Sequence, residues 1–209
     1  MVEELGVSIL QMMENAGRSL AALAIERWAP KRVTVLAGSR GNGGGGMAAG
    51  RHLANRGIAV VVTTSRPSDR LDGAAAAQMR SLQAIGVPNM ADPPPADLVI
   101  DALVGYSLMG DLHGRAAELV EWANGHGPIL ALDVPSGLEP TTGRIGIPCV
   151  KAAATMTLAL PKQGLTRSEG VVGDLYLADI SVPPDTYRRM GIDLEDPFGG
   201  RWVVAVDTE

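Results

Sequence analysis

Three polar residues in this chain have the types and the placement that ligand-binding chemistry needs. Asp101 and Asp133 each directly follow a short apolar run, and Asn42 lies in a glycine-rich segment that follows another. Apolar runs of this kind are typical of buried parallel strands. Because the carboxyl ends of parallel strands meet at one edge of an open sheet, we expect the two carboxylates and the amide to converge there.

The glycine-rich segment Gly38–Gly46, GSRGNGGGG, separates the apolar run Val33–Ala37 from a helix-like segment that opens at about Gly46. A strand, a glycine loop and a helix together present backbone N–H groups to an anion. Glycine allows the backbone to take positive φ and to approach a ligand closely. The segment lacks the Gly-Lys-Ser/Thr of a Walker A loop and is not a clean G-x-G-x-x-G. A tight turn that binds nothing is the alternative interpretation.

The same edge carries oxygen ligands for a cation. Asp101 and Asp133 are hard donors, and the Asn42 side chain, the Ser136 hydroxyl and loop carbonyls add to them. A weakly charged, carbonyl-rich shell suits a monovalent ion such as potassium better than a divalent one. Alternatively, Asp101 and Asp133 cap the turns that follow them, since Asp readily accepts backbone hydrogen bonds.

Other reactive residue types give weaker patterns. The histidines, His52, His113 and His126, lack metal-ligand spacing. Cys149 is the only cysteine. A single cysteine excludes a disulfide within the chain and a thiolate metal cluster. We predict that Cys149 fills space in the core.

Composition narrows the class of protein further. The 209 residues, 46% of them apolar, suit one domain with a real core, and 26 glycines favour close helix–sheet packing. The net charge of −5 and the absence of a Lys/Arg block exclude broad binding to a nucleic-acid backbone. No apolar run reaches the ~18 residues of a membrane span, and the acidic start, MVEELG, is unlike a signal peptide. We therefore expect a cytoplasmic protein.

Alternating helix and strand patterns must position these residues. The patterns predict helices at Leu5–Trp28, from the glycine segment to about Asn55, from an N-cap at Asp69 through Ala84, and at Leu112–Asn124. They predict strands at Val33–Ala37, Ile58–Thr64, Asp97–Leu103 and Pro128–Leu132, with Thr155–Leu160 and Asp174–Ile180 at one edge. Alternation of this kind predicts an α/β fold with a mostly parallel sheet and helices on both faces. We predict one domain over residues 1–182 and an extension or tail over residues 183–209.

An ordered set of motifs resembles a known family. Met13-Glu14-Asn15-Ala16-Gly17 comes first, followed by the glycine segment, Asp101-Ala102-Leu103-Val104-Gly105 and Asp133-Val134-Pro135-Ser136-Gly137. Lys151-Ala152 and Pro161-Lys162 echo later positions. From Met13 to about Ile180 the chain resembles the YjeF N-terminal domain family, the NAD(P)H-hydrate epimerases, which includes the apolipoprotein A-I-binding proteins.

The resemblance implies a three-layer α/β/α Rossmann-like sandwich. It implies an isomerase that interconverts the R and S hydrates of NADH and NADPH, damaged cofactors with a hydroxyl at C6 of the nicotinamide ring. A separate dehydratase would then act on the product, and the dehydratase domain of fused members is expected to be absent. The family's habits also favour a homodimer.

The resemblance also implies site residues. Asn42, Asp101 and Ser136 would hold potassium. The hydrate would contact residues of the glycine segment, a second loop and a strand end: Gly41, Asn42, Gly43, Gly44, Gly45, Gly105, Tyr106, Ser107, Leu108, Met109, Gly110, Asp111 and Asp133. An epimerase must break and remake a bond at one carbon, so proton transfer near the C6 hydroxyl is needed. Asp133, a carboxylate at a desolvated strand end, is our candidate for that acid–base role.

Departures from the family pattern leave alternatives open. The family loop reads G-P-G-N-N-G-G-D-G, so Gly45 stands in place of its Asp and Arg40 adds positive charge in place of a small residue. If that Asp is essential, the protein is a catalytically inactive module that binds a nucleotide-like ligand. A hydride-transfer oxidoreductase is disfavoured, because Thr63-Thr64-Ser65-Arg66 lacks an acidic ribose ligand. Arg66 would suit a 2′-phosphate there, but the loop spacing is wrong for that class.

Overall fold

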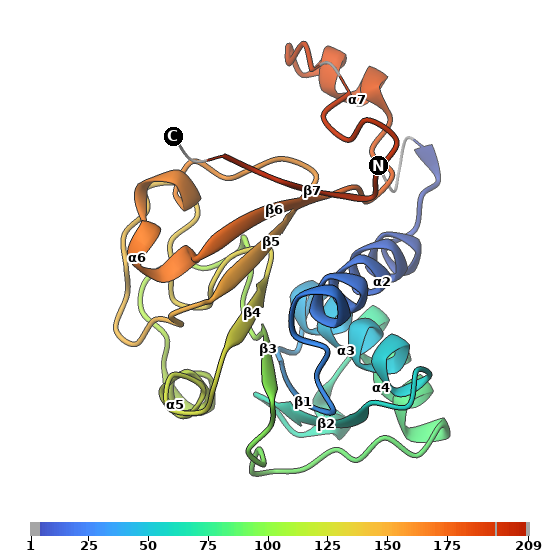
Figure 1. The fold of residues 1–209 in the computed structure, drawn as a ribbon, viewed down its shortest axis with the longest axis vertical. Coiled ribbons are helices and arrows are strands. Elements are labelled where there is room, and N and C mark those ends of the chain that lie inside the picture. The colour runs from blue at the N-terminus through green and yellow to red at the C-terminus, as the bar shows by residue number, and fades with distance from the viewer. Residues whose placement is uncertain (1–4, 195, 208–209) are drawn as a thin grey trace.

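A single seven-stranded sheet forms the centre of the molecule in the computed structural model, which describes residues 5–194 and 196–207 (Figure 1). The strand order is β2-β1-β3-β4-β5-β6-β7. The strands are β1 (Arg32–Ala37), β2 (Ala59–Thr64), β3 (Leu98–Ala102), β4 (Ile129–Leu132), β5 (Ala154–Leu158), β6 (Asp174–Ala178) and β7 (Val203–Ala205). The first six are parallel, and β7 runs antiparallel to β6.

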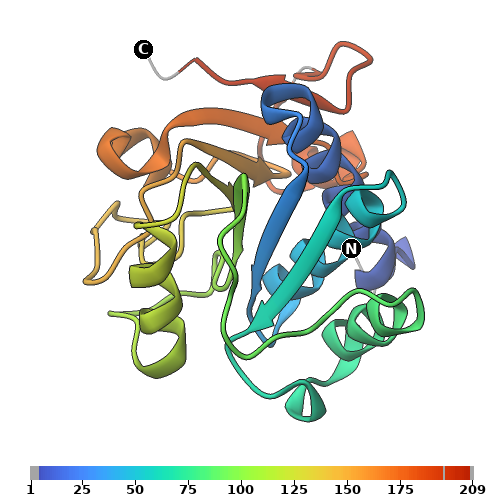
Figure 2. The same cartoon turned by 60° about the horizontal axis from the view of Figure 1, so that its bottom comes forward.

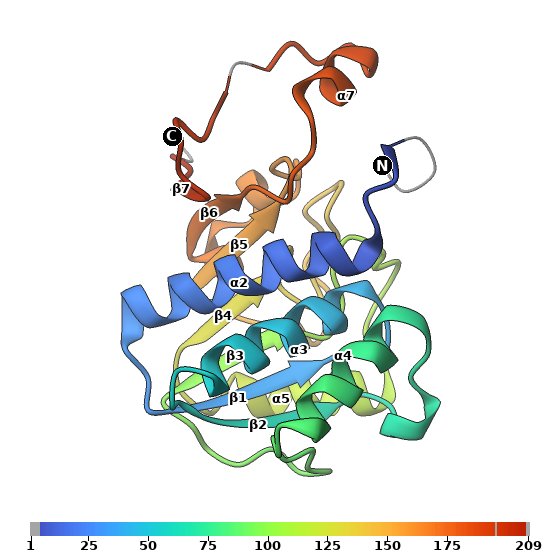
Figure 3. The ribbon, with the colours of Figure 1, turned by 90° about the vertical axis from the view of Figure 1, so that its right-hand side faces the viewer.

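Helices cover both faces of the sheet. The longer helices are α2 (Ile9–Trp28), α3 (Gly41–Ala54), α4 (Gly73–Ala84) and α5 (Gly114–Ala123), and the short ones are α6 (Glu169–Val172) and α7 (Pro184–Arg189). Figure 3 shows α2, α3 and α4 stacked on one face, with α5 behind the sheet, and Figure 2 shows α5 apart from them. The predicted three-layer α/β/α sandwich is therefore confirmed. No helix among the described residues has the length and apolar character needed to cross a membrane.

Each face of the sheet has its own apolar core. Under α2, α3 and α4, the alternate strand residues Val33, Val35 and Ala37 pack with Met47 and Leu53 of α3. Under α5, strand residues of opposite orientation, including Leu36 and Val99, pack against Leu119 and Val120. Strand side chains alternate between faces, so the continuous apolar runs of the sequence reflect burial on both sides.

The strand order creates a switch point at β1 and β3. The chain leaves β1 toward β2 on one side, whereas β3 and all later strands lie on the other side. In open parallel sheets of this kind, ligands bind where the connections from two neighbouring strands diverge. The two segments that diverge here are the glycine segment after β1 and the loop 103–113 after β3.

The glycine segment is helical from Gly41 onward, which corrects the predicted helix start at about Gly46. Helix α3 begins at Gly41, and Arg40 is its N-cap residue. The glycines serve close packing: a Cβ on Gly43 would lie 1.8 Å from the Gly38 carbonyl oxygen, and one on Gly46 would lie 2.4 Å from the Ala102 Cβ. Glycine therefore lets the first turn of α3 pack directly against the ends of β1 and β3, although glycine has a low intrinsic helix propensity.

Two other predicted helix starts move, and a side-chain cap accounts for the first of them. Helix α2 begins at Ile9 rather than Leu5, because Ser8 and Gln11 form a reciprocal capping box. Helix α4 begins at Gly73 after Asp72, and the predicted cap Asp69 lies in a short 3₁₀ turn.

Glu14 of the Met13–Gly17 motif ties the three helices of one face together. Its carboxylate on α2 accepts hydrogen bonds from Arg51 on α3 and Gln78 on α4 and contacts His52. Desolvation opposes ionisation of Glu14, but these hydrogen bonds hold the pKa of its carboxyl below the usual range. Gly17 completes the contact, since a Cβ there would lie 2.5 Å from the Ala48 Cβ.

The predicted extension, residues 183–209, includes short regular elements. It contains α7 and β7, and β7 pairs with β6 through Ala178↔Val203 and the next two positions. It thereby adds an antiparallel edge strand to the sheet (Figure 1). The boundary at residue 182 stays a prediction.

The packing of α3 predicts a large loss of stability for one alanine substitution in its first turn and almost no change for another. Gly43→Ala forces a Cβ against a backbone oxygen that cannot move away, so we expect the free energy of unfolding to fall by about 2 kcal/mol or more. Gly41→Ala meets nothing within 4 Å and should change it by less than about 0.5 kcal/mol. Urea denaturation of both variants measures the difference. Equal losses would contradict the packing described here.

Candidate active site

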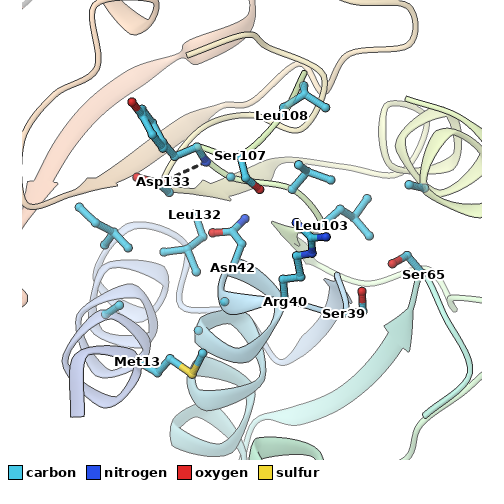
Figure 4. Close-up of a pocket in the computed structure, with 18 of the residues that line it drawn as sticks. Met13, Ser39, Arg40, Asn42, Ser65, Leu103, Ser107, Leu108, Leu132 and Asp133 are labelled. Carbon is cyan, nitrogen blue, oxygen red and sulfur yellow. Dashed lines mark hydrogen bonds between the residues drawn. The ribbon is translucent and has the colours of Figure 1, made fainter. Parts of the chain in front are cut away.

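A cavity of about 730 Å³ opens at the switch point, where the carboxyl ends of β1, β2, β3 and β4 meet the starts of α2 and α3 (Figure 4). Its polar lining includes Ser39, Arg40, Asn42, Ser65, Arg66, Ser107, His113, Arg115 and Asp133. Its apolar lining includes Ile9, Met12, Met13, Leu103, Leu108, Leu132, Leu158 and Ile180. Largely apolar walls with a few convergent polar groups are typical of small-molecule sites.

Asp101 lies below the loop that follows β3, fully buried. Its Oδ1 accepts hydrogen bonds from the Ser136 hydroxyl (2.7 Å) and the Leu103 N–H (3.2 Å), and its Oδ2 accepts one from the Ser136 N–H (2.8 Å). The Ser136 hydroxyl also lies 3.2 Å from the Val104 carbonyl oxygen. The structure thus brings two of the three predicted cation ligands into direct contact.

Asp101 is a buried carboxylate whose hydrogen-bond partners in the described part of the chain are all neutral. None of the ion pairs formed among residues 5–194 and 196–207 includes it. Burial raises the pKa of the Asp101 carboxyl to about 6, although the hydrogen bonds from Ser136 and Leu103 oppose the rise. Buried charges in proteins are normally paired or bind metal ions, and a carboxylate has capacity for a further partner beyond three hydrogen bonds. A buried carboxylate left unbalanced in this way is chemically suited to a bound cation.

Asn42, the third predicted ligand, lies in the first turn of α3 and faces Asp133 across Gly105 (Figure 4). A Cβ on Gly105 would lie 3.1 Å from the Asn42 Oδ1 and 3.0 Å from the Asp133 Oδ2. The Asn42 Nδ2 is buried with no hydrogen-bond partner among the described residues. A buried amide without a partner is costly in a protein interior, so this group is available to a ligand.

Asp133 is held from two sides at the end of β4. Its Oδ2 accepts a hydrogen bond from the Tyr106 N–H (3.2 Å), and its Oδ1 forms an ion pair with Lys162. The Lys162 ammonium also donates to the Leu158 carbonyl (2.8 Å) and the Thr157 hydroxyl (3.1 Å). Asp133 has a φ of 69°, a left-handed conformation that few non-glycine residues adopt. Such backbone outliers cluster at functional sites.

The loop after β3 takes its shape from these same side chains. The N–H groups of Leu103, Val104 and Tyr106 donate to Asp101, Ser136 and Asp133, respectively. The cation ligands and the candidate acid–base residue therefore fix one stretch of backbone that lines the cavity.

The predicted substrate contacts divide into two groups. Those that line the cavity are Gly41, Asn42, Gly45, Gly105, Tyr106, Ser107, Leu108, Met109 and Asp133. The others are directed elsewhere: Gly43 and Gly44 are buried against Gly38 and Met13, and the Asp111 carboxylate pairs with Arg144 at 2.9 Å. Gly110, with a φ of 81°, serves the turn before Asp111.

Sequence reasoning missed several residues at the site. Lys162 enters the sequence analysis only through the Pro161-Lys162 pair, with no role at the site, yet its side chain is largely buried against Asp133. A lysine four residues after an apolar strand carries no pattern that would reveal this pairing. Leu132 is the second omission: its Cδ2 lies 2.8 Å from where a Cβ on Gly45 would be. Cys149 packs as predicted, and burial raises the pKa of its thiol to about 12.

The fold and the site define the class: an α/β protein of Rossmann-like topology whose switch-point cavity combines largely apolar walls with one carboxylate, Asp133. A model of the family described as "YjeF-related protein N-terminus" matches residues 9–164. The chain belongs to this family.

Curated relatives extend over most of the chain. It is 43% identical over 213 residues to a protein of Dehalogenimonas lykanthroporepellens named NAD(P)H-hydrate epimerase, covering 97% of this chain and 86% of that one. A protein of the same name from Rhodopirellula baltica is 35% identical and covers 87% of this chain and 79% of its own length. A Hyperthermus butylicus protein named bifunctional NAD(P)H-hydrate repair enzyme is 40% identical, and the match spans 37% of its length.

A solved structure supports the fold independently. The crystal structure of yeast YNL200c superposes with a TM-score of 0.84 at 23% identity, covering 98% of this chain and 93% of that one.

The raised pKa of the Asp101 carboxyl predicts how the free energy of unfolding depends on pH. Because its pKa is higher in the folded protein than the usual 3.8, the folded state holds this proton more tightly. As the pH rises from about 4 to about 6, the free energy of unfolding of the wild type should therefore fall by on the order of 3 kcal/mol relative to that of Asp101→Asn. Urea denaturation of both proteins in potassium-free buffer measures the difference. A constant difference across this range would contradict the buried, unpaired carboxylate.

Proposed function

We propose that this protein interconverts the R and S hydrates of NADH and NADPH, with the reacting ring bound at Asp133. The observation that carries the proposal is the Asp133 carboxylate in the wall of an apolar cavity, at the switch point of a fold whose relatives are named NAD(P)H-hydrate epimerases. The reaction needs a group that gives a proton to a departing hydroxyl and takes one back. A carboxyl group within reach of the ring can do both.

The proposed mechanism is one of proton transfer at C6. The Lys162 ammonium supplies a proton, through the Asp133 carboxyl paired with it, to the C6 hydroxyl; the C6–O bond breaks, and the hydroxyl leaves as water. The ring nitrogen supplies the electron pair that forms a C=N bond, so C6 becomes planar. Water then adds to the opposite face of C6, and its proton returns through the Asp133 carboxylate to Lys162. No atoms are gained or lost, and only the configuration at C6 changes.

Neighbouring side chains support each part of this sequence. Lys162 orients the Asp133 carboxylate and balances its charge. The buried Asn42 amide and the backbone of Gly105 lie beside it, where they can hold the substrate's polar atoms. Leu108, Leu132 and Leu158 form apolar walls that limit the entry of bulk water to the planar intermediate.

Potassium belongs to the same proposal as a structural cation. Asp101, Ser136 and Asn42 would hold it, and the fit rests on the buried Asp101 carboxylate, which forms no ion pair with any cationic side chain of the described residues. When bound, the ion supplies positive charge beside Asp101 and favours its ionised form. Asp101 and Ser136 would then keep the loop after β3 in its binding shape through Leu103 and Val104.

The partners we propose follow from the chemistry. The product would pass to a separate dehydratase, and both reactions belong where the hydrates form, in the cytoplasm. Assembly as a homodimer is supported by exposed apolar side chains on the first turn of α2, Ile9 and Leu10.

A coupled assay tests the proposed reaction and its acid–base group. A mixture of R and S hydrates is treated with an S-specific dehydratase until the fast phase stops, and this protein is then added with potassium. We expect rapid consumption of the remaining R form, a loss of at least about 100-fold in kcat for Asp133→Asn, and a smaller loss for Lys162→Met. Lys151→Met, which removes an exposed lysine outside the cavity, is the matched control. Undiminished epimerisation by Asp133→Asn would eliminate the assigned role.

Gly45 bears on the alternative, a binding module without activity. Restoring the family's Asp there should destabilise the protein by about 1–3 kcal/mol, because its Cβ would collide with Leu132. We expect the penalty of Gly45→Asp to be smaller by about 1 kcal/mol in a Leu132→Val background, since the two sites are in contact. Urea denaturation of the wild type, Gly45→Asp, Leu132→Val and the double variant measures these free energies of unfolding. Equal penalties for Gly45→Asp in both backgrounds would refute the predicted contact. The alternative gains support only if the wild type is inactive and the double variant is active.

A further inference from the structure

We infer that Arg40 and Arg66 form an anion subsite at the end of the cavity away from Asp133, and that this subsite makes hydrated NADPH a better substrate than hydrated NADH. The inference deepens the proposed function and rests on it. It assigns the phosphate-bearing part of the substrate to named residues and gives the enzyme a preference between its two substrates.

The charge of the cavity is opposite to that of the protein. The chain has a net charge of −5, yet the charged residues that line the cavity are three arginines and one carboxylate, Asp133. One of the three, Arg115, is paired with Asp92 and Glu118. Arg40 and Arg66 take part in none of the ion pairs found among residues 5–194 and 196–207. Two guanidinium groups therefore remain available to an anionic ligand.

The strand order separates the arginines from the carboxylate. Arg66 follows β2, Arg40 follows β1, and Asp133 follows β4, and the sheet order β2-β1-β3-β4 places β2 and β4 three strand spacings apart. At about 4.8 Å per spacing, the distance between the two ends is about 14 Å. Figure 4 shows the same polarity: Arg40 extends from the start of α3 beside Leu103, and Ser39 and Ser65 lie on the side away from Asp133.

The proposed substrate has a matching polarity. Its nicotinamide ring lies at one end, its pyrophosphate in the middle, and its adenosine at the other end, where NADPH alone carries a 2′-phosphate. With the ring at Asp133, the pyrophosphate reaches Arg40 and the N–H groups at the start of α3. The adenosine ribose then reaches the end of β2, which is where sheets of this topology bind it. Ser65 and Arg66 lie at that position.

The residues after β2 favour a phosphate over a hydroxyl. Sheets of this topology that bind NAD place an Asp or Glu near the end of β2 to accept the ribose 2′-OH, whereas an arginine accommodates a 2′-phosphate. Here β2 ends in Thr63-Thr64 and continues with Ser65 and Arg66, and the next carboxylate, Asp69, does not line the cavity. A hydroxyl and a guanidinium can both donate to phosphate oxygens, and among the described residues the only carboxylate that lines the cavity, Asp133, lies at its other end.

Kinetics on the two hydrates measured separately test the subsite. We expect the wild type to have the higher kcat/KM on hydrated NADPH. Arg66→Gln should lower that value about 10-fold, which is the size of one lost hydrogen bond to a charged group, and should change the value for hydrated NADH less than about 2-fold. Arg40→Gln should lower both values, because both substrates carry the pyrophosphate.

Arg80→Gln is the matched control, since it removes an exposed arginine on α4 that does not line the cavity. It should leave both kcat/KM values unchanged, and Arg66→Lys should retain part of the preference. Equal losses on the two hydrates in Arg66→Gln, or none, would overturn the assignment.

Binding of adenosine fragments separates failure of the subsite from failure of the proposed function. Calorimetry with adenosine 2′,5′-bisphosphate and adenosine 5′-monophosphate needs no turnover. We expect the wild type to bind the bisphosphate about 10-fold more tightly and Arg66→Gln to bind the two nearly equally. Such binding in a protein that does not epimerise would uphold the subsite and reject the proposed function. Epimerisation without an Arg66-dependent preference in kcat/KM and binding would reject the subsite alone.

Discussion

The close approach of α3 to the sheet is the constraint on which the rest of the site depends. Gly43 lies directly over the Gly38 carbonyl, and Gly46 lies against Ala102 at the end of β3. Because no side chain separates helix from sheet there, the first turn of α3 reaches the ends of both strands at the switch point. Asn42 consequently faces Gly105 and Asp133, and Arg40 lies at the cavity wall. If a side chain separated the start of α3 from the sheet, Asn42 would move away from Asp133, and the proposed chemistry needs these two groups close together.

The fold and the convergence of Asp101, Asp133 and Asn42 could be predicted, because strand ends in a parallel sheet share an edge whatever the details of packing. The helical start at Gly41 could not, because a run of glycines has the lowest helix propensity among ordinary residues and only tertiary contacts stabilise it. Lys162 could not be paired with Asp133 either, since 29 residues separate them and both β5 and a turn must form before they meet. The start of α2 depended on a capping box that local sequence expresses weakly, whereas Asp72 at the start of α4 forms no side-chain cap.

The two carboxylates at this edge have environments that suit the different roles proposed for them. Asp101 is fully buried and surrounded by hydrogen-bond donors, so it suits a fixed structural charge. Asp133 lies in the cavity wall with a lysine beside it and a backbone conformation that turns it toward the ligand space. Environments that differ in this way are how one chemical group serves both support and proton transfer.

The loop after β3 has a thermodynamic consequence for the whole site. Asp101 and Ser136 hold its first two N–H groups, and Asp133 holds a third, so one backbone segment has two sets of anchors. If two ligands, one at Asp101 and one at Asp133, each bind more tightly in one arrangement of this segment, each changes the affinity of the other by the same factor. Cation and substrate would thus be reciprocal effectors, and the ionic composition around the protein would tune how tightly it holds a damaged cofactor.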